Sequence, residues 1–114
     1  MKVVLAGGSG QVGSMLARAF RRDSQEVVVL SRIASPAPWR VVAWDGKHAG
    51  DWVKDLDGAD VVINLTGRSV NCRYHDRNRA EIMESRLNSV RAIGEAINTV
   101  DHPPATFFDH IILF

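Results

Sequence analysis

A glycine-rich stretch near the amino terminus constrains the fold of this chain more than any other feature. The segment LAGGSGQVGS, residues 5–14, places four glycines within seven positions, directly after a short apolar run. Gly7, Gly10 and Gly13 give the spacing GxxGxxG, and a start at Gly8 gives GxGxxG with the same last two glycines. The loop leaves a predicted buried strand and opens a predicted helix, which is the context that gives this motif its physical meaning.

The chemistry of this loop suits a phosphate group. An early glycine permits a tight turn, Gly10 lets the backbone approach a pyrophosphate, and Gly13 lets the helix pack closely on the strand. Free N–H groups and the positive end of the helix dipole then face the phosphates. A P-loop is excluded because Ser14 stands where lysine would follow Gly13, and a merely tight turn without a ligand is the alternative. The expected dinucleotide-binding loop consists of Gly7, Gly8, Ser9, Gly10, Gln11, Val12 and Gly13.

Short apolar runs predict strands that are buried in a sheet. The predicted strands are 3–6, 26–30, 40–44 and 60–65, and a fifth is expected within 105–114. The fifth strand would cover an edge that otherwise exposes unpaired backbone groups. The alternation of strands and helices predicts an α/β fold, a Rossmann-like, doubly wound and mostly parallel sheet of about four to five strands with flanking helices.

Helical periodicity predicts three helices between these strands. Asp51 is expected to cap a short one that ends at Asp57 and Gly58. In the longest helix, over about 76–100, Gly94 costs about 1 kcal/mol relative to alanine and is expected to mark a close approach to another backbone. The apolar stripe of the helix over 11–22 consists of Val12, Met15, Leu16, Ala19 and Phe20. The apolar seam of the longest helix consists of Met83, Leu87, Val90, Gly94 and Ile97.

The end of the second predicted strand favours NADP over NAD as the cofactor. An NAD site would have an acidic residue here to bind the ribose hydroxyls, but this chain has Ser31 and Arg32. Arg32 lies 19 residues after Gly13, about where that acidic residue is expected. A guanidinium suits a 2′-phosphate, and an exposed loop arginine without a ligand is the alternative.

Composition excludes several other classes of function. The 114 residues carry a formal net charge of +1, which gives no argument for nucleic acid or a membrane surface as a partner. Cys72 is the only cysteine, so an internal disulfide and a cysteine-based metal site are both excluded. We find no signal peptide and no apolar run long enough to span a membrane, and therefore expect a cytoplasmic protein.

Five segments occur together in the order typical of one known family. They are GGSGQVG, LSR, WDG, VVINLTG and ESRLNSVRAIGEAI, within residues 2 to about 104. In this the chain resembles the extended short-chain dehydrogenase/reductase superfamily, and within it the sugar-nucleotide epimerase branch of the 39U type. The resemblance implies that Ser31 and Arg32 contact the 2′-phosphate of NADP, and that Asp45 lies near the adenine. It also implies that the nicotinamide-ribose side is lined by Leu65, Thr66 and Gly67.

The chain departs from that branch at two positions after the fourth strand. Thr66 stands where alanine is common, and Arg68 stands where glutamate is common. Arg86 falls near an asparagine that many relatives use to support the active site. From the residues alone, Arg86 is either an interior anion contact or a surface charge.

The tyrosine–lysine pair on which the chemistry of this superfamily depends does not occur in this sequence. A phenol with an ordinary pKa of about 10 needs a nearby lysine before it can exchange protons near neutral pH. Tyr74 is the only tyrosine, Asn78 stands four residues later, and every lysine precedes Tyr74. No histidine has a carboxylate partner at a recognisable spacing, so each is expected to be a surface or loop residue. We therefore assign no catalytic residue and no metal ligand.

Three functions from different classes fit these observations. The first is the NADP-binding domain, residues 1–114, of an epimerase or oxidoreductase that acts on a sugar nucleotide in longer relatives. That expectation takes the chain to be truncated after the start of the fifth strand. The second is a non-catalytic NADP-binding sensor or interaction module, and the third is a structural remnant. A homodimer formed through the long helix is possible in each case.

Overall fold

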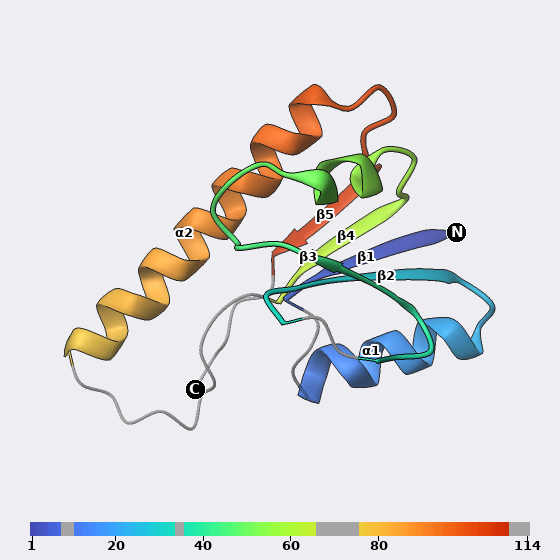
Figure 1. Ribbon diagram of the computed structural model, residues 1–114, viewed down its shortest axis with the longest axis horizontal. Coiled ribbons are helices and arrows are strands. Elements are labelled where there is room, and N and C mark those ends of the chain that lie inside the picture. Colours follow the sequence, from blue (N-terminus) through green and yellow to red (C-terminus); the bar gives the residue numbers. More distant parts are fainter. Residues whose placement is uncertain (8–10, 34–35, 66–75, 110–114) are drawn as a thin grey trace.

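The structure is a computed structural model that describes residues 1–7, 11–33, 36–65 and 76–109. Its strands and helices alternate along most of the chain, and the strands lie side by side in one sheet (Figure 1). The elements are β1 (Lys2–Ala6), α1 (Gln11–Arg22), β2 (Glu26–Ser31), β3 (Arg40–Ala43), the 3-10 helix η1 (Asp51–Leu56), β4 (Val61–Asn64), α2 (Asp76–Thr99) and β5 (Thr106–Asp109).

The sheet has the strand order β3-β2-β1-β4-β5, and every neighbouring pair is parallel. The central strand is β1, because its residues Val3–Ala6 form the continuous apolar run that both faces of a covered parallel sheet require. In register, Leu5 of β1 lies between Val29 of β2 and Ile63 of β4. The predicted Rossmann-like α/β fold is therefore confirmed, with all five expected strands in one parallel sheet.

Helices cover both faces of this sheet, which makes the fold doubly wound. Figure 1 shows α1 on one side of the sheet and α2 and η1 on the other. Successive strand residues point to opposite faces, so the buried side chains form two clusters, one against α1 and one against α2 and η1. The cluster below α1 includes Val3, Leu5, Ala17, Val27 and Val29. The cluster below α2 and η1 includes Val4, Ala6, Val28, Leu30, Trp52, Leu56, Val62 and Ile93.

The buried face of α2 differs from the predicted seam. Leu87 was placed in that seam, yet 55% of its surface is exposed. The residues that face the core are Ser89, Ala92, Ile93 and Ala96, and Ile97 packs beside them. Ile93 is the large apolar side chain of this face, and it packs in the core cluster between the small residues Ala92 and Ala96. The prediction for Leu87 was wrong because it followed the spacing of the large apolar residues. The face of α2 that is buried instead carries the small residues Ser89, Ala92 and Ala96.

The expected close approach at Gly94 is also wrong for the part of the chain that the structure describes. A Cβ added at Gly94 would meet no atom within 4 Å. The side chain of Met83, the first member of the predicted seam, lies outside the described residues.

The stripe predicted for α1 is partly correct. Leu16 and Phe20 pack on the core as expected, but Met15 is 62% exposed and Ala19 is exposed. Ala17, which the stripe omitted, is fully buried. As in α2, a small residue marks the line of closest contact with the sheet.

The short helix η1 starts as predicted but is capped differently. Gly50 holds the N-cap position, and Asp51 is the first residue inside the helix, so the predicted cap at Asp51 is wrong. Burial of Trp52 and Leu56, both almost fully inaccessible, anchors this turn under α2. Its stability therefore comes from tertiary packing.

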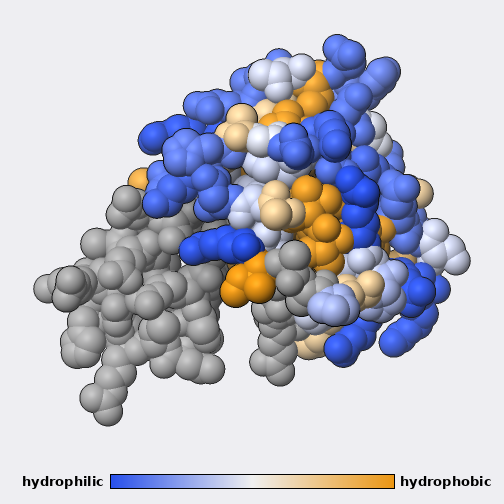
Figure 2. Space-filling model, in the orientation of Figure 1, coloured by the Kyte–Doolittle hydropathy of each residue, from blue (hydrophilic) through white to orange (hydrophobic). Residues whose placement is uncertain are grey.

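On the face shown in Figure 2, most of the coloured surface is hydrophilic, and hydrophobic side chains are exposed in groups between hydrophilic ones. Phe107 and Phe108, on the edge strand β5, are 36% and 57% exposed. No helix in the described part of the chain is long and apolar enough to cross a membrane.

Candidate functional site

Backbone hydrogen bonds join the carboxyl ends of the central strands. The N–H of Gly7 donates to the carbonyl of Leu30 at 2.8 Å, which ties the exit of β1 to the end of β2. The N–H of Leu65 donates to the carbonyl of Ala6 at 2.8 Å, which ties the exit of β4 to β1. The strand order places β2 and β3 on one side of β1, and β4 and β5 on the other, so the direction of winding reverses at β1. Open α/β sheets bind ligands at the carboxyl ends of the strands where this reversal occurs. Figure 1 shows these strand ends converging.

The glycine motif lies at this edge, between a strand and a helix. Gly7 has a φ of 73°, a left-handed conformation that strongly favours glycine. Gly13 is buried within α1, where the absence of a side chain permits close packing on the sheet. The first N–H groups of an α-helix have no partner inside the helix, and such an N-terminus can bind an anion. Outside the described residues lie Gly8, Ser9 and Gly10, and the side chains of Gln11 and Val12.

Ser31 and Arg32 occupy very different environments at the end of β2. Ser31 is only 2% exposed, and its hydroxyl donates to the carbonyl of Ile33 at 2.8 Å and accepts from the Ile33 N–H at 3.2 Å. Arg32 is exposed, and its guanidinium has no hydrogen bond or ion pair with any residue that the structure describes. A cation therefore stands at the carboxyl edge, two residues after the carbonyl that binds Gly7.

Asp45 closes the loop that follows β3. One carboxylate oxygen accepts from the backbone N–H groups of Lys47 and His48, both at 2.8 Å, and the other lies 2.6 Å from the His48 Nδ1. These hydrogen bonds hold the pKa of Asp45 well below its usual range. Gly46 supplies the left-handed residue of the turn, with a φ of 77°. Both oxygens of Asp45 are thus already engaged, although the residue lies at the predicted edge of the sheet.

A tryptophan pair fixes this loop to η1. The Trp52 indole N–H donates to the carbonyl of His48 at 3.0 Å, and the rings of Trp44 and Trp52 meet edge to face at 5.3 Å. Edge-to-face contact is a favoured arrangement for buried aromatic rings. The Asp45 loop therefore has a defined position relative to the core.

The expectation that no histidine has a carboxylate partner at a recognisable spacing is wrong for His48. His48 pairs with Asp45, and the His102 Nδ1 lies 3.1 Å from a carboxylate oxygen of Asp57. His48 and His102 are exposed, as expected of loop histidines. The Asp45–His48 spacing of three residues was a visible signal, whereas the other pair joins residues far apart in sequence. Outside the described residues lie His75 and His110.

Sequence reasoning missed a buried polar contact behind the β4 exit. The Asn64 side-chain N–H donates to the Ser89 hydroxyl at 3.0 Å, and both residues are fully buried. The bond joins α2 to the last residue of β4, directly before Leu65, which is half-buried. An asparagine inside the apolar run DVVINL was the available signal. Outside the described residues lie Thr66, Gly67, Arg68 and Tyr74, and the side chains of Asn78 and Arg86.

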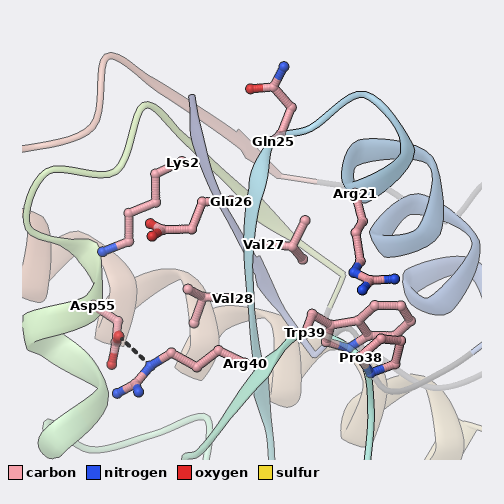
Figure 3. A pocket seen from close by; sticks show the side chains of 10 residues that line it. All are labelled: Lys2, Arg21, Gln25, Glu26, Val27, Val28, Pro38, Trp39, Arg40 and Asp55. Atoms are coloured by element: carbon pink, nitrogen blue, oxygen red, sulfur yellow. Dashed lines mark hydrogen bonds and ion pairs between the residues drawn. The ribbon is translucent and has the colours of Figure 1, made fainter.

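A cavity of about 440 Å³ lies at the opposite, amino-terminal edge of the sheet (Figure 3). It is lined by the first residues of three strands, Lys2, Glu26 and Arg40, and the Arg40 Nε lies 3.1 Å from a carboxylate oxygen of Asp55. The described residues contain no group of three or more His, Cys, Asp or Glu side chains placed to hold a metal ion. The glycine motif and Arg32 are at the other edge, so this cavity is separate from the candidate site.

Comparison with protein families matches residues 3–108 to the NAD dependent epimerase/dehydratase family. The epimerase family protein SDR39U1 of Mus musculus is 31% identical over 107 residues, which cover 91% of this chain and 34% of that protein. The epimerase family protein SSP1921 of Staphylococcus saprophyticus is 26% identical over 106 residues, which cover 93% and 36%. The chain thus spans about a third of the length of these relatives.

Two solved structures share the fold of this chain. The human epimerase family protein SDR39U1, isoform 2, crystallised with NADPH, has a TM-score of 0.76 at 26% identity, covering 96% of this chain and 36% of that chain. A UDP-glucuronic acid 4-epimerase from Bacillus cereus has a TM-score of 0.72 at 19% identity, covering 96% and 39%, and shows a shared fold alone. The family model matches nearly all of the sequence, and the chain therefore belongs to the NAD-dependent epimerase/dehydratase family, with a Rossmann-like fold.

Proposed function

We propose that this chain binds NADP(H) at the carboxyl edge of its sheet. The observation that carries this proposal is the placement of Arg32, an exposed cation without a protein partner among the described residues. It follows the Leu30 carbonyl by two residues, and that carbonyl binds the N–H of Gly7 at the start of the glycine loop. In this proposal, the glycine loop and the start of α1 bind the pyrophosphate, and the guanidinium of Arg32 binds the 2′-phosphate.

The described residues fit such a cofactor. The left-handed φ at Gly7 and the buried Gly13 suit the close backbone approach of a pyrophosphate, and the start of α1 has N–H groups that are not used within the helix. The guanidinium of Arg32 suits a phosphate dianion bidentately. The Asp45 turn is proposed to lie beside the adenine, with Leu65, Thr66 and Gly67 on the nicotinamide-ribose side.

The chemistry that NADP(H) supplies when bound is hydride transfer. The role of this chain's own residues is to bind and orient the dinucleotide. Its 114 residues contain no YxxxK pair, so they are not assigned a proton-transfer step. We propose that residues 1–114 serve as one NAD(P)-binding domain, and that a protein as long as the relatives uses it for an epimerase or oxidoreductase reaction on a sugar nucleotide. A homodimer and a cytoplasmic location belong to the same proposal.

The absence of a YxxxK pair also supports a second candidate function. A chain that binds NADP but lacks the proton-transferring residues can act as a non-catalytic sensor or interaction module. A remnant that binds no dinucleotide would be the remaining possibility. Turnover of a sugar nucleotide by the 114-residue chain would contradict both of these functions, whereas cofactor binding without turnover supports the sensor.

Calorimetric titration of NADPH and NADH against the wild-type chain and the Arg32→Ala variant tests the proposed function. We expect NADPH to bind about ten- to hundredfold more tightly than NADH, as charge-assisted hydrogen bonds to one phosphate allow. Arg32→Ala should remove most of that difference. Arg22→Ala, which removes an exposed arginine at the end of α1, is the matched control and should retain it. Equal or undetectable binding of both cofactors by the wild type would overturn the proposal.

A further inference from the structure

The register of the sheet leaves an opening at its amino-terminal edge. β3 begins at Arg40, which lies opposite Val28 of β2, so Glu26 and Val27 extend past the start of β3. Pro38 has no backbone N–H, and the pairing with β2 therefore cannot continue through it. The cavity of about 440 Å³ lies beside these residues, and Asp55 of η1 is part of its lining.

The wall of this cavity contains a buried carboxylate with one unused oxygen. Asp55 is 7% exposed, and its Oδ1 accepts from the Arg40 Nε at 3.1 Å. Its Oδ2 is buried and has no hydrogen-bond partner in the part of the chain that the structure describes. Buried polar atoms without a partner are rare, and this one can accept a hydrogen bond from a ligand that carries a donor.

The same half of the cavity has charged groups of both signs. Figure 3 shows the side chains of Lys2, Glu26, Arg40 and Asp55 on one side of β2. The Glu26 carboxylate has no ion pair with any described residue, and the Lys2 Nζ contacts only the Asp57 carbonyl, at 3.4 Å. A ligand with a single charge would meet a like charge here. A zwitterion instead finds a partner for each of its charges.

The other half of the cavity has an apolar and aromatic wall. Figure 3 shows Val27, Pro38 and Trp39 on the opposite side of β2, together with the side chain of Arg21. Val27 is buried and Trp39 is half-buried. Sites for small molecules have volumes of about 300–1,000 Å³ and combine apolar walls with a few charged groups. The cavity has both properties.

We propose that this cavity binds a small zwitterion with an apolar side chain, of the type of an aromatic amino acid. The ammonium group donates to the Asp55 Oδ2, the carboxylate lies at Lys2, and the side chain packs against Trp39. The side chain of Arg40 is 58% exposed, so it can move to admit the ammonium group without disturbing the core. The glycine motif is at the opposite edge of the sheet, and this inference does not depend on NADP(H) binding.

Three compounds with the same ring test the proposal against the wild-type chain. Phenylalanine has both charges, phenethylamine has only the ammonium group, and phenylpropionate has only the carboxylate. Titration of each compound into the isotope-labelled chain, followed by the backbone amide signals in NMR, measures the dissociation constant and the place of binding. We expect a dissociation constant of about 1 mM or below for phenylalanine, and about tenfold weaker binding for each analogue. The signals that shift should be those of Glu26, Val28 and Arg40.

Two variants assign each charge of the ligand to its residue. Asp55→Asn should weaken binding of phenylalanine about tenfold or more, and should leave phenylpropionate, which has no ammonium group, within about twofold. Lys2→Met should weaken phenylalanine about three- to tenfold and leave phenethylamine within about twofold. The matched controls are Asp51→Asn and Lys54→Met, which change exposed residues of η1 outside the cavity lining and should alter no affinity.

Three results would overturn the proposal. Equal binding of the three compounds, or no binding of phenylalanine, would show that the cavity does not select a zwitterion. Shifts at Gly7 and Leu65 in place of Glu26 and Val28 would place the ligand at the other edge of the sheet. Retained phenylalanine affinity in Asp55→Asn would remove the role of the buried oxygen. If Asp55→Asn does not fold, the three-compound series and Lys2→Met still decide the outcome.

Discussion

Ile93→Ala should destabilise this chain far more than Leu87→Ala, although both residues lie on α2. Ile93 is fully buried in the cluster that includes Leu56 and Val62, whereas Leu87 is 55% exposed. Truncation of Ile93 removes three carbon groups at about 0.8 kcal/mol each, and an unrelaxed cavity adds roughly 1 kcal/mol or more. We expect a loss of about 3–4 kcal/mol for Ile93→Ala and of less than about 1 kcal/mol for Leu87→Ala.

Urea unfolding monitored by circular dichroism measures both differences. A domain of this size has a free energy of unfolding of roughly 5–15 kcal/mol, so Ile93→Ala can approach the limit of stability. Ile93→Val, expected to cost about 1 kcal/mol, keeps the comparison measurable, and it should lower Tm by about 3–6 °C. Equal losses for the two alanine variants, or a larger loss for Leu87→Ala, would refute the observed orientation of α2 and restore the predicted seam.

Three further predictions concern single side chains. Ser89→Ala removes the acceptor of the Asn64 side-chain N–H in a fully buried setting, and urea unfolding should show a loss of about 1–3 kcal/mol; a loss below about 0.3 kcal/mol would contradict the contact. The pKa of Asp45 is lowered from its ordinary value of 3.8, so its stabilising effect is present above that pH and is lost as the pH falls below it. Thermal melts from about pH 7 to about pH 3 should therefore show a weaker acid dependence for Asp45→Asn than for wild type, and identical slopes would disprove this. Gly94→Ala should raise the free energy of unfolding by about 0.5–1 kcal/mol because its Cβ would meet no atom within 4 Å, and a destabilised variant would reveal a backbone close to this turn.

The fold could be predicted because its signals are local and periodic. A continuous apolar run at Val3–Ala6 identifies the doubly covered central strand, and the glycine motif identifies the turn from β1 into α1. The buried faces of the helices were less predictable. In α2, Ala92 and Ala96 lie against the core although Leu87 has the larger apolar surface. The buried face of α2 carries small residues, and the spacing of large apolar residues in the sequence does not identify that face.

The candidate site was predictable in its residue types and much less so in its contacts. The glycine motif, Arg32 and the exit of β4 were assigned to one cofactor site, and they do follow strands whose carboxyl ends meet at one edge of the sheet. Asn64 and its bond to Ser89 were missed, since they join residues on β4 and α2 that no spacing relates. The partner of His48 was within reach of the sequence, because Asp45 lies three residues earlier in the same turn.

The sequence by itself determined the parallel α/β architecture, the position of the glycine loop and the presence of a cation at the end of β2. These depend on hydrophobic period, on glycine content and on charge, all of which can be read along a linear chain. Only the tertiary structure decided that the Ser31 hydroxyl closes on Ile33 and that the small face of α2 meets the sheet. Hydrogen-bond partners and packed faces depend on distances within a few tenths of an ångström, which are set when strands and helices come together.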